Sequence, residues 1–224
     1  MATICNFPDI DIYLLYYLDI KSVIRLSAIS KDQHTLLSNL DFVRELHLLK
    51  NTLGTQQKNT INYASQYNFI SILQWMHDSS NEFLYTDNAI DFAALHGHVS
   101  VLNWFDKMSD IYEFKYSKYA INWASSKAHI EILEWFDKSK YEFKYDIHAI
   151  KNAVMNGHTE VLDWFDKSKY EFKYDEMIIN FALYNQRIPT LEWFKKSKYE
   201  FKYSSNVSYS IEIQNWLKIN KLEI

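Results

Sequence analysis

The sequence of 224 residues has very little cysteine, glycine or proline. It contains one cysteine, Cys5, together with three glycines and two prolines. A single cysteine excludes an internal disulfide framework and favours a reducing compartment. Because helix-breaking residues are so scarce and aromatic residues make up 17% of the chain, we expect a nearly all-helical, well-packed protein.

The sequence also lacks long apolar runs and a strong charge of one sign. No run of apolar residues approaches the length that crosses a bilayer. Asp9 and Asp11 lie where a secretory leader would carry basic residues. The formal net charge of −4 implies no polyanionic partner. We therefore expect a cytoplasmic protein that binds neither membranes nor nucleic acid.

Sequence motifs of common enzymes are missing as well. There is no glycine-rich phosphate loop, no Gly-x-Ser-x-Gly and no Cys-x-x-Cys. His98, His129 and His158 recur once per repeat, but packed helices lie about 8–10 Å apart, whereas each zinc ligand must approach to about 2 Å. These histidines therefore cannot converge on one ion. We predict no catalytic residue, no metal and no cofactor.

What the sequence does contain is an internal repeat. The phrase WFDKSKYEFKYD at 135–146 recurs letter for letter at 164–175 and, with one change, at 193–203. Looser copies begin at Trp75 and Trp104, so that successive tryptophans lie 29, 31, 29 and 29 residues apart. A fixed period of this size is typical of stacked-repeat proteins.

Each copy predicts a helix, a turn, a second helix and an extended segment, which we call the finger. In the copy at 149–175, apolar residues at helical spacing occur at 149–154 and 161–165, on either side of Asn156-Gly157-His158. Rings and charges then alternate at 170–174, which favours an extended chain. We expect the finger rings to pack between repeats and the repeated tryptophans to be buried: Trp104, Trp135, Trp164 and Trp193.

The run Ala-Ile-x-x-Ala-x-x-x-Gly-His-x-Glu-Val-Leu-x-Trp resembles the ankyrin repeat, and its short Trp-Phe-Lys-Tyr style is similar to that of giant DNA viruses. The resemblance covers roughly 60–218, with a period of mostly 29 residues instead of the family's about 33. It implies an all-α fold, an ankyrin-like helical-hairpin solenoid with five repeats at 60–206 and a capping helix at 207–224. It also implies that the imidazole of each Gly-His turn ties neighbouring turns together by hydrogen bonds.

Residues 1–50 do not follow the repeat and predict a head of three short helices, joined to the repeats by a polar segment at 51–59. Phe7-Pro8, the aliphatic run that ends at Leu18, Asp19 and the next apolar helix together resemble the F-box. That resemblance implies docking to a Skp-type subunit of a cullin–RING ubiquitin ligase. Matched residue by residue, the docking positions are Phe7, Pro8, Leu14, Leu15, Leu18, Ile24 and Leu26.

Positions that vary among the copies are candidates for target recognition, because the invariant positions are needed to hold the stack together. In ankyrin proteins the first helices and the fingers line the concave binding face. The candidates lie at the start and in the last turn of the predicted first helices: Asn88, Leu95, His96, Tyr119, Ser126, Lys127, His148, Met155, Asn156, Met177, Tyr184 and Asn185. Drift at exposed positions is the alternative explanation.

Two functions fit the sequence. In the first, the protein is an interaction adaptor whose head docks the Skp-type subunit while its repeats hold an unidentified target protein. In the second, it is an ankyrin-repeat scaffold that binds or blocks a host protein without any ubiquitin-ligase link. In both, we expect a non-enzymatic protein that is a monomer on its own and, if viral, resides in the host cytoplasm.

Overall fold

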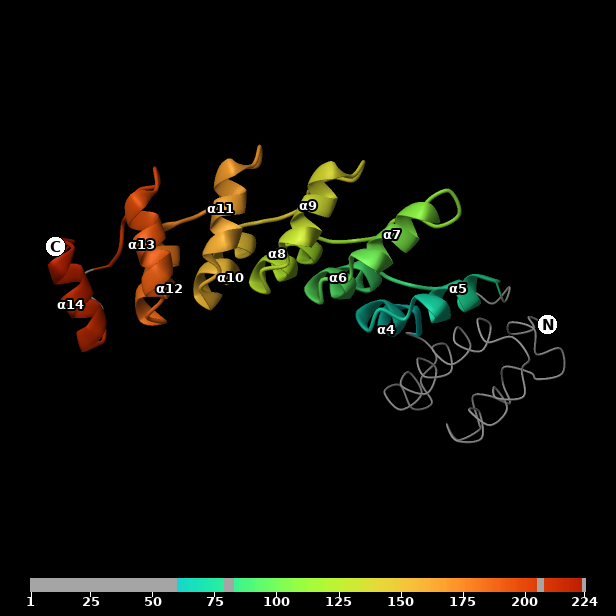
Figure 1. The fold of residues 1–224 in the computed structure, drawn as a ribbon, viewed down its shortest axis with the longest axis horizontal. Coiled ribbons are helices and arrows are strands. Elements are labelled where there is room, and N and C mark those ends of the chain that lie inside the picture. Colours follow the sequence, from blue (N-terminus) through green and yellow to red (C-terminus); the bar gives the residue numbers. More distant parts are fainter. Residues whose placement is uncertain (1–59, 79–82, 205–207, 223–224) are drawn as a thin grey trace, which may run out of the picture. The chain divides into compact units, whose positions relative to one another are not determined.

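A computed structural model describes residues 60–78, 83–204 and 208–222 (Figure 1). Within these ranges the chain forms eleven α-helices and no β-strand. None of the described helices is long and apolar enough to cross a membrane. The predicted head, the joint at 51–59 and the docking residues between Phe7 and Leu26 lie outside the described residues.

The helices follow one another as five helix–turn–helix pairs and a last single helix. They are α4 (Thr60–Gln66) and α5 (Ile70–Asp78), α6 (Asn88–Leu95) and α7 (Val99–Lys107), α8 (Tyr119–Ser126) and α9 (Ile130–Lys138), α10 (His148–Asn156) and α11 (Thr159–Lys167), α12 (Glu176–Tyr184) and α13 (Ile188–Lys196), and α14 (Ile211–Ile219). The all-α prediction is confirmed for the described residues, and so is the order of helix, turn and helix within each copy.

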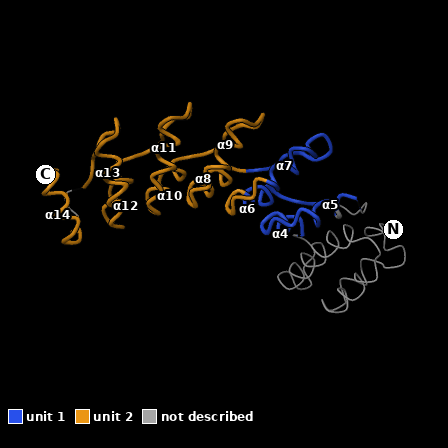
Figure 2. Tube along the Cα trace, viewed as in Figure 1, with its two compact units in different colours: residues 1–93, 100–116 blue, residues 94–99, 117–224 orange. Residues whose placement is uncertain are grey.

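The chain divides into two units (Figure 2). Unit 1 comprises residues 1–93 and 100–116, and within it α4 packs against α5. Unit 2 comprises residues 94–99 and 117–224. In unit 2, α10 lies between α8 and α12, while α11 lies between α9 and α13, and each first helix packs on its own second helix. Unit 2 therefore has a layer of first helices and a layer of second helices.

The interior is built from positions that do not change between copies. One column is always alanine and the other always leucine, and every member is fully buried: Ala64, Ala93, Ala124, Ala153 and Ala182, and Leu73, Leu102, Leu133, Leu162 and Leu191. A small residue in the first helix allows the two helices of a pair to approach closely, and the leucine of the second helix fills the space between them.

The expected burial of the repeated tryptophans is wrong for three of the four. Trp104 is 7% exposed, but Trp135, Trp164 and Trp193 are only half-buried. The deepest position belongs to the phenylalanine that follows each tryptophan, and each of these is 1% exposed: Phe105, Phe136, Phe165 and Phe194. Neighbouring side chains on a helix point about 100° apart, and in these three copies the phenylalanine faces the core while the tryptophan lies at its edge.

The half-buried tryptophans instead receive the fingers. The ring of Phe143 stacks on Trp164 at 5.4 Å and on Tyr170 at 3.9 Å, between ring centroids. One copy later, Phe172 repeats both contacts, with Trp193 at 5.4 Å and Tyr199 at 4.1 Å. The prediction that finger rings pack between repeats is confirmed for these two copies.

A serine follows each of the second helices α9, α11 and α13 and starts its finger. Ser168 Oγ donates to the backbone oxygen of Phe165 at 2.9 Å and accepts from the backbone N–H of Tyr170 at 3.2 Å. Ser139 and Ser197 make the same two bonds in their copies. The hydroxyl therefore satisfies a carbonyl left over by the helix and fixes the direction in which the finger leaves.

Candidate target-binding surface

The first helices of unit 2 each expose a stripe of side chains at positions i, i+4, i+7 and i+8, which lie on one side of a helix. We call these the first-helix stripes. They consist of Tyr119, Trp123, Ser126 and Lys127 on α8, of His148, Asn152, Met155 and Asn156 on α10, and of Met177, Phe181, Tyr184 and Asn185 on α12. None of these side chains is buried, while the opposite side of each helix carries the invariant alanine.

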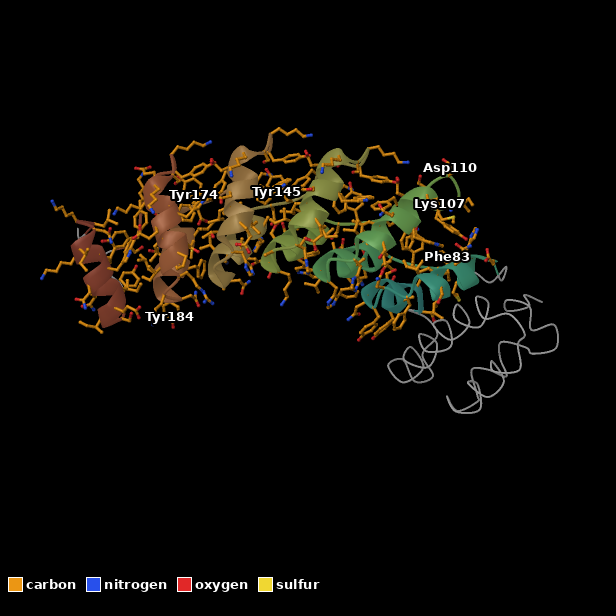
Figure 3. The ribbon with its side chains drawn as sticks, in the orientation of Figure 1. Phe83, Lys107, Asp110, Tyr145, Tyr174 and Tyr184 are labelled. Carbon is orange, nitrogen blue, oxygen red and sulfur yellow. The ribbon has the colours of Figure 1, made fainter. Side chains whose placement is uncertain are left out.

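The twelve predicted target-binding residues are all described and none is buried. Eight are exposed and four, Leu95, Ser126, Met155 and Asn185, are half-buried. The largest exposed side chains are Tyr184 at 74%, Met177 at 55% and Tyr119 at 47%. Figure 3 shows Tyr184 at the lower edge of unit 2 and the finger residues Tyr145 and Tyr174 above it. Asn88 belongs to unit 1 and the other eleven belong to unit 2.

The side chains of two predicted residues, Asn156 and Asn185, also serve the fold. Asn156 Nδ2 donates to the backbone oxygen of Ser126 at 3.1 Å and lies 3.2 Å from its hydroxyl. Asn185 Nδ2 donates to the carbonyl oxygen of Phe181 in its own helix at 2.8 Å. A recognition role is not needed to explain these polar side chains, because they satisfy backbone oxygens near the helix ends.

The expected hydrogen bond between neighbouring turns is present at His158. Its Nε2 lies 3.2 Å from the backbone oxygen of Ser126, so this nitrogen carries the proton of the bond. At the equivalent place in the next copy, Arg187 Nε donates to the backbone oxygen of Met155 at 2.8 Å. The sequence change from Gly-His to Gln-Arg therefore preserves the connection between turns.

The turns themselves require a left-handed residue. The backbone φ is positive at the same position of all five pairs: Asn68, Gly97, Ala128, Gly157 and Gln186. Only two of the five are glycine, the residue that adopts this conformation without strain. Gly97 is also required for space, since a Cβ there would lie 2.6 Å from Nδ1 of His129.

Asp146 organises the approach to α10. Its Oδ1 accepts from Nδ2 of Asn122 at 2.8 Å and from the backbone N–H of His148 at 3.0 Å, and Nδ1 of His148 is also 3.0 Å away. Its Oδ2 lies 2.7 Å from Nζ of Lys118. Partial burial raises the pKa of Asp146, but these hydrogen bonds, led by that of Lys118, outweigh it and hold the pKa far below its usual range. His148 is therefore positioned by a carboxylate at one edge of the first-helix stripes.

The asparagine that bonds Asp146 belongs to a recurring connection. Asn122 also accepts from the backbone N–H of Asp146 at 3.3 Å, 24 residues ahead. Asn180 makes the same pair of bonds with Ser204, and within unit 1 Asn62 does so with Thr86. We did not predict this connection, although its signal was available: an asparagine lies two residues before the invariant alanine in three of the copies.

Aromatic rings lie on the first-helix stripes, and a lysine lies beside them. Tyr119 stacks on Trp123 with centroids 5.0 Å apart. Lys151, on the α10 flank that faces α12, places Nζ 4.4 Å from the ring centroid of Phe181. Trp123, Lys151 and Phe181 were not among the predicted residues. Extending the variable positions by one helical turn would have found Trp123 and Phe181.

The lysines of the fingers are used within the repeats. Lys169 Nζ lies 2.9 Å from Asp137 Oδ1, and Lys198 Nζ lies 2.8 Å from Asp166 Oδ1. The hydrogen bonds from these lysines lower the pKa of both carboxyls. The fingers were predicted to be nearly neutral, and these two lysines are indeed paired with aspartates of the preceding copy.

Among the described residues, no group of three or more His, Cys, Asp or Glu side chains is placed to hold a metal ion. No protein-family model matches this chain, and no curated protein sequence matches it.

Proposed function

We propose that the protein is a protein–protein interaction adaptor. Its repeats form an ankyrin-like helical-hairpin solenoid that holds a target protein, and its F-box-like head docks a Skp-type subunit of a cullin–RING ubiquitin ligase. The proposal that the repeats bind a target rests on the first-helix stripes. There, large side chains are exposed on the same helices that bury the invariant alanines.

Two features support a repeat scaffold of the ankyrin type. The copies recur at a nearly constant period, and in unit 2 equivalent helices lie next to one another in two layers. Architectures of this kind present extended surfaces on successive repeats. The variable stripes lie on such a surface, which suits recognition of another macromolecule and needs no cofactor or catalytic group.

The ligase link rests on the head. A head of about fifty residues, as the sequence predicts, would have only a small core of its own, yet this segment carries Leu14, Leu15, Leu18, Ile24 and Leu26. Exposed apolar patches commonly mark interfaces. We propose that these residues, with Phe7 and Pro8, contact the Skp-type subunit, and that the protein acts in the cytoplasm, the host cytoplasm if it is viral.

The second candidate is a repeat scaffold without a ligase link. It is favoured by the location of the first-helix stripes, which are formed entirely by α8, α10 and α12. A target could therefore be bound or blocked without any contribution from residues 1–59.

Binding of a purified Skp-type adaptor to the full chain separates the two candidates. We expect binding at micromolar concentration, measured by biolayer interferometry. Replacing Pro8→Ala together with Leu15→Asp should abolish it without shifting the melting transition of the repeats. A wild-type chain that does not bind the adaptor would remove the ligase function and leave the scaffold.

A further inference from the structure

We infer that the first-helix stripes of unit 2 bind an extended acidic segment of a protein, with a large apolar side chain near each end of the bound stretch. The inference rests on the proposed function, because it names the chemistry of the target that the repeats hold.

Apolar contact area lies on both flanks of the stripes. On α8, Tyr119 and Trp123 stack on each other, and Tyr119 is 47% exposed. On α12, Met177 and Tyr184 are exposed and Phe181 is half-buried. Tyrosine and tryptophan supply large contact areas at low entropic cost, which is why they dominate protein interfaces.

The distance between the flanks sets the length of the ligand. Both α8 and α12 pack against α10, and packed helices lie about 8–10 Å apart. The two aromatic flanks are therefore separated by roughly 16–20 Å. An extended chain advances about 3.3 Å per residue, so about five or six residues span from one flank to the other.

Two lysines lie on and beside the stripes. Lys151 projects from α10 toward α12, and Lys127 is exposed at the end of α8. Neither Lys127 nor Lys151 has a carboxylate within ion-pair distance among the described residues. The nearby Asp146 is already bonded by Lys118. A ligand carboxylate between the two apolar anchors would therefore meet cations that the fold itself does not neutralise.

A protein segment fits these charges better than a nucleic acid does. Phosphate chains gain affinity from many cations that act together, whereas this chain carries a net charge of −4. Lys169 and Lys198 on the fingers are held in ion pairs with aspartates. The stripes thus offer two lysines close to their aromatic anchors, which suits a short acidic peptide.

Selection from a displayed library of random twelve-residue peptides on the immobilised full chain tests the inference. The enriched peptides should carry two aromatic or aliphatic residues about five or six positions apart, with Asp or Glu between them. Tyr184→Ala and Lys151→Glu should each weaken the binding of an enriched peptide by about tenfold or more, measured by fluorescence polarisation.

Matched controls separate recognition from folding. Lys167→Glu makes the same charge change at an exposed position of the second-helix layer, and Ile219→Ala removes an exposed apolar side chain from α14. Neither should change peptide affinity, and all four variants should melt close to the wild type. Exchanging the central acids of the peptide for lysine should abolish binding to the wild type and restore part of the binding to Lys151→Glu.

Three results would overturn the inference: no enrichment, enrichment of peptides without central acids, or stronger binding of a ten-nucleotide polyuridine RNA that displaces the peptide. Binding of the Skp-type adaptor is measured on the same preparation. Adaptor binding without peptide enrichment removes only this inference. Enrichment without adaptor binding supports the inference and removes only the ligase function.

Discussion

Arg187 donates a hydrogen bond from Nε to the backbone oxygen of Met155 at 2.8 Å. One copy earlier, the imidazole of His158 makes the equivalent bond to the backbone oxygen of Ser126. A guanidinium and an imidazole are chemically different donors, yet each bridges two turns at the same register. The constraint on this position is therefore a donor of sufficient reach and not histidine as such.

Replacing Arg187→Ala should destabilise the fold, because the Met155 carbonyl loses its donor. We expect a loss on the order of 1 kcal/mol in the free energy of unfolding, measured by urea denaturation. Arg187→His should retain most of the stability, since histidine makes the equivalent bond one copy earlier. If the alanine and histidine variants had the same free energy of unfolding, the hydrogen bond to the Met155 carbonyl would not contribute to stability.

Replacing Ala128→Gly should stabilise the protein by up to about 1 kcal/mol. Ala128 has a φ of 58°, and this left-handed conformation is strained for any residue that has a Cβ atom. The entropy lost by glycine offsets part of the gain. The reverse change, Gly157→Ala, should lower the melting temperature. Gly97→Ala should lower it further, because its new Cβ would also collide with the His129 ring. Equal shifts for the two glycine positions would contradict the close approach at Gly97.

Asp146 should contribute stability that depends on pH. Because its pKa in the folded state lies below its value in the unfolded chain, the stabilisation is fully present above the unfolded pKa of about 3.9. It should then diminish as the pH falls from there toward the folded pKa. The difference in unfolding free energy between wild type and Asp146→Asn should therefore shrink as the pH is lowered from about 5 to about 2, a range set by the pKa of aspartate in the unfolded chain. Asp110→Asn, at an exposed loop position, serves as the control; a difference that stays constant with pH would exclude the ion-pair explanation.

Truncating Phe136→Ala should destabilise the protein more than Trp135→Ala, although tryptophan is the larger side chain. Phe136 is 1% exposed, and deleting a buried phenylalanine typically costs about 3–5 kcal/mol. Trp135 is half-buried and stacks on Tyr141 at 5.9 Å. Chemical denaturation of both variants measures the order, and a larger loss for Trp135→Ala would place the tryptophan in the core after all.

The internal repeat made the helices, turns and fingers predictable, because copies that must pack on one another share the same buried columns. The repeat period does not indicate which of two adjacent aromatic residues faces the core. Trp164 and Phe165 both satisfy the helical pattern, but Phe165 is buried whereas Trp164 is half-buried and stacks on Phe143 of the preceding copy.

The candidate surface was predictable in outline and not in detail. Variation among copies identified Tyr119, Met177 and Tyr184, which are exposed. It also selected Asn156, whose amide serves a neighbouring turn. The cation–ring contact of Lys151 joins residues 30 positions apart along the chain, so no local pattern contains it.

The stacking of Phe143 on the next copy, repeated by Phe172 on the copy after that, has a consequence for how such a chain can grow. Because the joining residues are the same at both junctions, a gene segment that encodes one period can be duplicated or lost and the newly adjacent copies will still meet through matching rings. Array length can thus change during evolution without the invention of a new interface. Each added copy would bring one more exposed stripe on which substitutions can accumulate independently.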